Sequence, residues 1–130
     1  MKHSERQVYA ALSTLVMLQM IMLGSLFAGI KPHPPALTPL FAIAPFLAVS
    51  VSTAISAMIV QPLNNRTGQI LSTLACLMAL ISFGPQKYFD AQFGLIWPAV
   101  MLGQGAALIV FLHLLRAHRS KSQNTRTVSN

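Results

Sequence analysis

The chain has 130 residues, of which 54% are hydrophobic and only 8% are charged, and its mean hydropathy is +0.60. Soluble domains carry charge on roughly a quarter of their residues, so this composition excludes a water-soluble globule. It also excludes intrinsic disorder, which requires low hydrophobicity. One cysteine, Cys76, cannot form a disulfide framework. We therefore interpret the chain as a small integral membrane protein.

Four apolar segments, separated by prolines and polar residues, are the candidate membrane spans, since a spanning helix needs about 20 predominantly apolar residues. In chain order they are residues 8–30, 39–60, 69–84 and 93–115. The third is the shortest and spans only if it includes its polar flanks. We predict an all-α integral membrane protein with four transmembrane helices in a compact bundle. A Leu-Ser-Thr-Leu motif opens both the first and the third segment, which leaves open whether the bundle consists of two repeated helical hairpins.

The distribution of basic residues predicts the orientation, because Lys and Arg in short loops stay in the cytoplasm during insertion. If both termini and the loop 61–68 lie on one side, that side holds seven of the nine basic residues: Lys2, Arg6, Arg66, Arg116, Arg119, Lys121 and Arg126. We therefore expect a multi-pass protein of the cell inner membrane with a cytoplasmic N-terminus (residues 1–7). The basic tail, residues 116–130, is expected to be cytoplasmic and disordered. Its expected partner is anionic lipid rather than nucleic acid.

Small residues recur every three or four positions in all four segments. Helices in lipid associate where small residues allow close approach, so these positions are predicted to pack against other helices. They are Gly24, Ala28, Ala44, Ala48, Ser52, Ser56, Ala75, Ala79, Gly103 and Ala107.

Two glutamines, Gln19 and Gln104, are the strongest polar groups within the apolar segments. An unsatisfied amide in lipid costs several kcal/mol, so each is expected to hydrogen-bond across helices. The predicted partners are each other, or Ser52 and Thr53. The alternative is that both line a polar path for a substrate.

Four polar residues are expected on the outward side: His33, Lys87, Tyr88 and Asp90. Together they have the chemistry to bind an anionic head group or a partner's loop. The alternative is that Tyr88 belongs to an interfacial aromatic belt and that Lys87 and Asp90 form a solvated pair.

The expected function follows mainly from an absence. None of the four apolar segments contains an Asp, Glu, Lys or Arg, which argues against ion-coupled transport and acid/base catalysis. We predict a protein that is not an enzyme, binds no cofactor, and is an accessory, assembly or scaffold component of a membrane complex. It would bind another membrane protein or further copies of itself. A small oligomeric carrier or channel for a neutral or lipid-like substrate is the alternative, and a membrane enzyme with a pocket of His33, Lys87 and Tyr88 is the third hypothesis.

Overall fold

The computed structural model describes residues 2–30, 40–89, 91 and 93–128, which are almost entirely helical and contain no strand. Four long helices follow in chain order: α1 (His3–Ala28), α2 (Leu40–Ile59), α3 (Arg66–Phe83) and α4 (Phe93–Val128). A short 3-10 helix, η1 (Pro85–Phe89), precedes α4. Each of the four is long and apolar enough to cross a membrane. The prediction of an all-helical chain with four such helices is therefore confirmed, while the hairpin duplication stays a prediction.

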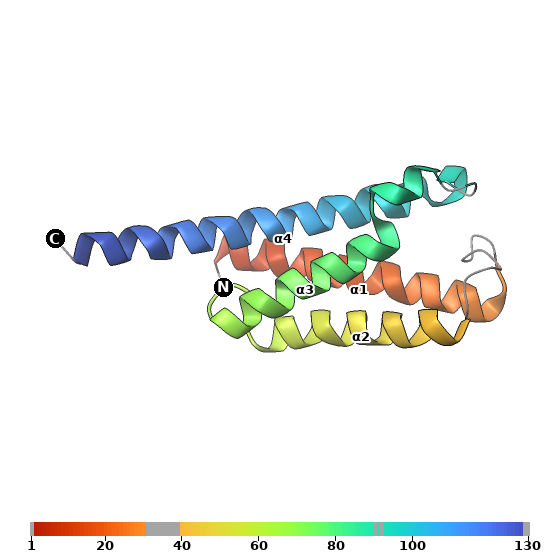
Figure 1. Ribbon diagram of the computed structural model, residues 1–130, viewed down its shortest axis with the longest axis horizontal. Helices are drawn as coiled ribbons and strands as arrows, with labels where there is room; N and C mark the ends of the chain where they lie inside the picture. Colours follow the sequence, from red (N-terminus) through yellow and green to blue (C-terminus); the bar gives the residue numbers. More distant parts are fainter. Residues whose placement is uncertain (1, 31–39, 90, 92, 129–130) are drawn as a thin grey trace.

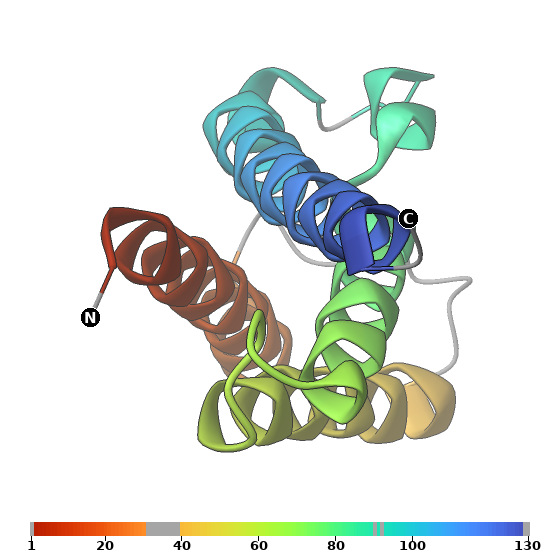
Figure 2. The same ribbon diagram turned by 90° about the vertical axis from the view of Figure 1, so that its left-hand side faces the viewer.

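The four helices run alternately up and down and occupy the corners of a bundle (Figures 1 and 2). α1 and α3 each contact both α2 and α4, and a smaller contact between α1 and α3 crosses the middle. This arrangement brings the first and last helices side by side, although they are far apart in the sequence.

Helix α3 is longer than predicted because an asparagine caps it early. Asn65 has extended backbone angles, and its side-chain oxygen accepts a hydrogen bond of 2.6 Å from the Gly68 amide. Such a cap satisfies an amide that the first turn leaves unpaired. The helix therefore begins at Arg66 rather than at residue 69, and reaches 18 residues.

The core consists mainly of small and aliphatic side chains. Because alanine and cysteine are small, the helices approach one another closely in this region. The buried cluster is made of Val8, Ala11, Leu12, Leu15, Ala54, Ala57, Ala75, Cys76, Ala79, Ala106, Ala107, Val110 and Leu114.

The prediction of a disordered tail from Arg116 is wrong, because α4 continues without a break to Val128. No Gly or Pro follows Gly105 in the sequence, so no residue of the tail interrupts the backbone hydrogen-bond ladder of the helix. Figure 1 shows this extension of α4 reaching well past the other helices. The basic residues of the tail are therefore arranged along a helix.

The two ends of the bundle differ in charge. The start of α1, the turn between α2 and α3, and the last part of α4 lie at the same end (Figure 1). Lys2, Arg6, Arg66 and Arg116 therefore gather there, whereas Lys87 lies in η1 at the opposite end. We call these the basic end and the η1 end.

Candidate functional site

Gln19 lies in the core and is hydrogen-bonded to a residue that the sequence analysis did not name. Its side chain is 1% exposed, and its amide donates a bond of 2.6 Å to the Ser50 hydroxyl, which is also 1% exposed. The predicted partners are not used, because Ser52 is exposed and the Thr53 hydroxyl donates to the Val49 carbonyl of its own helix. The Gln19–Ser50 pair therefore joins α1 to α2.

Two buried serines, Ser50 and Ser72, are expected to respond differently when each is replaced by alanine. Ser50→Ala leaves the Gln19 amide without its acceptor and is expected to lower the free energy of unfolding by about 1 kcal/mol. Ser72 is equally buried, but its hydroxyl has no hydrogen-bond partner. Ser72→Ala removes an unsatisfied group and is expected to leave stability unchanged or to raise it. Reversible unfolding in mixed micelles measures both, and an equal loss in the two variants would refute the assignment.

Gln104 holds η1 against α4 rather than meeting Gln19. Its amide nitrogen donates to the Phe83 carbonyl at 3.3 Å, and its oxygen accepts a bond of 3.0 Å from the Tyr88 hydroxyl. The Tyr88 ring also packs on Phe93, with ring centroids 5.2 Å apart. The two glutamines thus have separate roles, each with its own local partners.

Only part of the predicted outward group can be placed. Tyr88 is engaged with Gln104, and Lys87 lies half-buried in the same short helix. His33 and Asp90 fall outside the described residues. Of the described members of this group, Tyr88 therefore links η1 to α4.

The predicted small-residue positions divide into three groups. Ala75 and Ala79 on α3, and Gly103 and Ala107 on α4, are buried. Ala44 and Ser56 are half-buried. The remaining four are exposed: Gly24, Ala28, Ala48 and Ser52.

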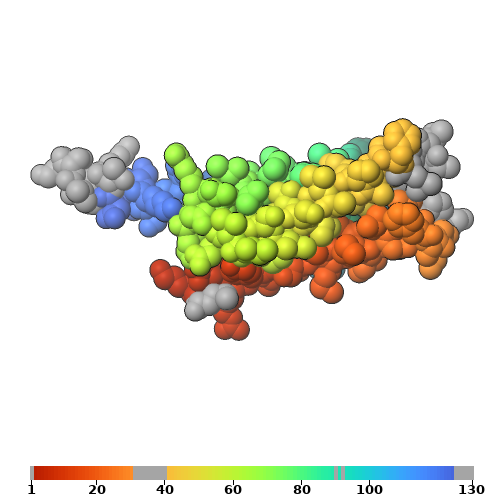
Figure 3. Space-filling model, turned by 90° about the horizontal axis from the view of Figure 1, so that it is seen from below, coloured from red at the N-terminus to blue at the C-terminus, as the bar shows by residue number. Residues whose placement is uncertain are grey.

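The exposed side of α2 forms one continuous stripe. A helix turns by about 100° per residue, so positions three and four apart share a face. On α2 the face opposite the core carries Phe41, Pro45, Ala48, Ser52, Ile55 and Ile59, all exposed, and we call this set the α2 stripe. Its ends are bulky and very open, with Phe41 82% and Ile59 76% exposed. α2 lies along the face of the molecule seen in Figure 3.

The pattern of small residues in the sequence predicts the centre of this stripe but not its extent. It groups Ala48 and Ser52 with Ala44 and Ser56 because all four are small and four residues apart. Because α2 carries apolar residues on all sides, the spacing of its residues alone does not identify the exposed face.

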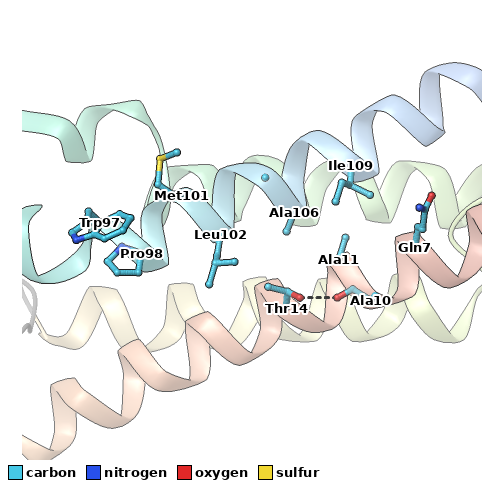
Figure 4. Close-up of a pocket in the computed structure, with 11 residues that line it drawn as sticks. Gln7, Ala10, Ala11, Thr14, Trp97, Pro98, Met101, Leu102, Ala106 and Ile109 are labelled. Atoms are coloured by element: carbon cyan, nitrogen blue, oxygen red, sulfur yellow. Dashed lines mark hydrogen bonds between the residues drawn. The ribbon is translucent and has the colours of Figure 1, made fainter.

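A groove of about 580 Å³ runs between α1 and α4 (Figure 4). Its polar members are already engaged, since the Thr14 hydroxyl donates to the Ala10 carbonyl at 2.9 Å and the Gln7 side chain bonds His113 at 2.8 Å. Neither Gln19 nor Gln104 lines it. The lining residues are Gln7, Ala10, Ala11, Thr14, Trp97, Pro98, Met101, Leu102, Gly105, Ala106 and Ile109.

No protein-family model matches this chain, and no characterised protein or solved structure is significantly similar to it, so the geometry above is the basis for its functional interpretation.

Proposed function

We propose that this is an integral protein of the cytoplasmic (inner) membrane that acts as a non-enzymatic accessory or scaffold subunit. In this proposal it binds another membrane protein through the α2 stripe. The observation that carries the proposal is the exposure of Ala48 and Ser52 at the centre of that stripe. The comparable small residues of α3 and α4 are buried inside the bundle.

Small residues favour a protein partner at this face over lipid alone. Membrane helices associate by van der Waals packing and interhelical hydrogen bonds, and both require close approach of backbones. Ala48 and Ser52 are four residues apart on one face, and their side chains are smaller than those at the two ends of the stripe. A partner helix that crosses there gains backbone contact, and the Ser52 hydroxyl lies within the crossing.

The orientation belongs to the same proposal. The basic end of the bundle holds Lys2, Arg6, Arg66 and Arg116, and such residues remain in the cytoplasm during insertion. Both termini would then be cytoplasmic, and η1 would face the opposite side. The α2 stripe would lie within the depth of the bilayer.

The carrier alternative has less support. A polar path shared by Gln19 and Gln104 would need the two amides to face a common space. Gln19 is instead bonded to Ser50, and Gln104 to Phe83 and Tyr88. A subunit role needs no such path.

Photocrosslinking in living cells tests the proposal. A photoreactive amino acid at Ser52 is expected to give one discrete protein adduct. The additional substitution Ala48→Leu is expected to abolish this adduct, because the larger side chain prevents close approach of a partner helix. The matched control is the same probe at Leu77 on α3, which is similarly open at 51% exposed. An adduct at Ser52 that survives Ala48→Leu, or the same adduct at Leu77, would count against a docking face on α2.

A further inference from the structure

We propose that the groove between α1 and α4 binds an anionic phospholipid, with one acyl chain along the groove and the phosphate at the basic end. This inference does not depend on the α2 stripe, which lies on a different helix.

The shape of the groove suits a flexible chain. Along α4 it extends from Trp97 to Ile109, which at about 1.5 Å per residue is about 18 Å. The hydrocarbon core of a bilayer is about 30 Å thick, so the groove covers the depth that one acyl chain occupies in a leaflet. Two of its lining residues, Ala10 and Gly105, are small, and a Cβ atom added at Gly105 would meet no atom within 4 Å. α1 and α4 separate toward the η1 end, which leaves the groove open along its side (Figures 1 and 4).

One end of the groove leads to the imidazole side chains of His3 and His113 and to the guanidinium of Arg116. Along α1, His3 and Gln7 are four residues apart and share a face, and Gln7 lines the groove. Along α4, the face of Ile109 continues to His113 and Arg116. The two faces meet where Gln7 bonds His113, and both His3 and Arg116 lie close enough to act electrostatically on His113.

The acidic residue nearest in sequence is engaged elsewhere. The Glu5 carboxylate accepts hydrogen bonds from the Lys2 backbone amide at 2.9 Å and from Asn64 at 2.8 Å, in the turn between α2 and α3. Neither of these bonds joins Glu5 to His3, His113 or Arg116. An apolar groove that ends near the Arg116 guanidinium matches an amphiphile with an anionic head, because basic residues at the membrane surface attract anionic lipid.

A lipid fits this groove better than a second copy of the chain. The chain has a net charge of +7, and a parallel copy would place its own basic end against this one. A helix also has a diameter of about 10 Å, whereas an acyl chain is thin enough to lie between two helices that are already in contact.

Native mass spectrometry of the full chain tests the proposal, with equal amounts of dioleoyl phosphatidylglycerol and dioleoyl phosphatidylcholine added in a non-ionic detergent. The wild type is expected to retain one phosphatidylglycerol, at least tenfold over phosphatidylcholine. Gly105→Leu fills the groove without changing charge and is expected to reduce retention at least tenfold. Its matched control is Gly24→Leu, since Gly24 is also helical with nothing within 4 Å of an added Cβ and lies outside the groove.

The charge at the end of the groove is tested separately. Arg116→Gln is expected to lower the preference for phosphatidylglycerol several-fold, whereas Lys87→Gln, which removes one positive charge at the η1 end, is expected to leave it unchanged. Thermal melting of each variant establishes that it is folded. If Gly105→Leu fails to fold, Ala10→Leu fills the same groove from its α1 wall.

Three results would overturn the proposal. The first is full phosphatidylglycerol retention by a folded groove-filling variant, and the second is equal retention of the two lipids by the wild type. The third is a wild-type dimer that Gly105→Leu converts to a monomer, which would assign the groove to a second copy.

Discussion

Replacing Gly68 with alanine is expected to lower the free energy of unfolding by about 3 kcal/mol, at the upper end of the usual cost of overpacking. Gly68 is buried in the first turn of α3, against the turn that precedes it. An added Cβ would overlap the Gln61 carbonyl oxygen and lie 2.8 Å from the Gln61 carbonyl carbon and 3.2 Å from Pro62 Cα. These are backbone atoms of a segment in which Gln61 already has a φ of 67°, so little room exists for adjustment.

Reversible unfolding in mixed micelles measures this effect, and Gly94→Ala is the matched control. Gly94 lies in the first turn of α4, as Gly68 does in α3, but a Cβ at Gly94 would meet nothing within 4 Å. The control is expected to unfold at the wild-type free energy or slightly above it, because alanine favours the helix. Equal stability of the two variants would show that the turn does not pack against α3 as described.

Gly103→Ala is expected to cost about 2 kcal/mol, because Gly103 of α4 lies against Phe83 at the end of α3. An added Cβ would lie 2.9 Å from Phe83 Cβ and 3.3 Å from Phe83 Cγ. Phe83 has little freedom to withdraw, since its side chain is 6% exposed and its carbonyl accepts a hydrogen bond from Gln104. The two helices must therefore move apart.

Gly105 provides the control for this second prediction, two residues further along the same helix. A Cβ at Gly105 projects into the open groove, so Gly105→Ala is expected to raise stability by up to about 1 kcal/mol through helix propensity alone. The same unfolding measurement compares the two variants. If Gly105→Ala were the more damaging substitution, the contact between α3 and α4 would have to be placed differently.

The helices and their approximate bounds follow from the sequence because hydrophobic length and Pro or Gly punctuation are local signals. The start of α3 was missed by three residues, because recognising Asn65 as the cap requires its backbone angles and its bond to Gly68. The polar composition of the tail predicts disorder, but no Gly or Pro follows Gly105, and the tail is helical to Val128.

The candidate sites were less predictable because they depend on which face of each helix turns inward. Gln19 was correctly singled out as a residue in need of a partner, but Ser50 lies two residues from the predicted Ser52 and on the opposite face of α2. The groove between α1 and α4 depends on the angle at which two helices far apart in the sequence meet. Small residues such as Ala10 and Gly105 gave no indication of that angle.

Cysteine labelling tests whether the four helices cross the membrane and leave both termini in the cytoplasm. In a Cys76→Ala background, single cysteines replace Lys2, Ser120 and Phe89, which are all exposed, the last at 94%. Spheroplasts are treated with a membrane-impermeant maleimide before and after permeabilisation. We expect Phe89→Cys to be labelled in intact spheroplasts, and Lys2→Cys and Ser120→Cys to be labelled only after permeabilisation. Labelling of Lys2→Cys and Ser120→Cys from opposite sides, or of all three from the same side, would contradict the proposed topology.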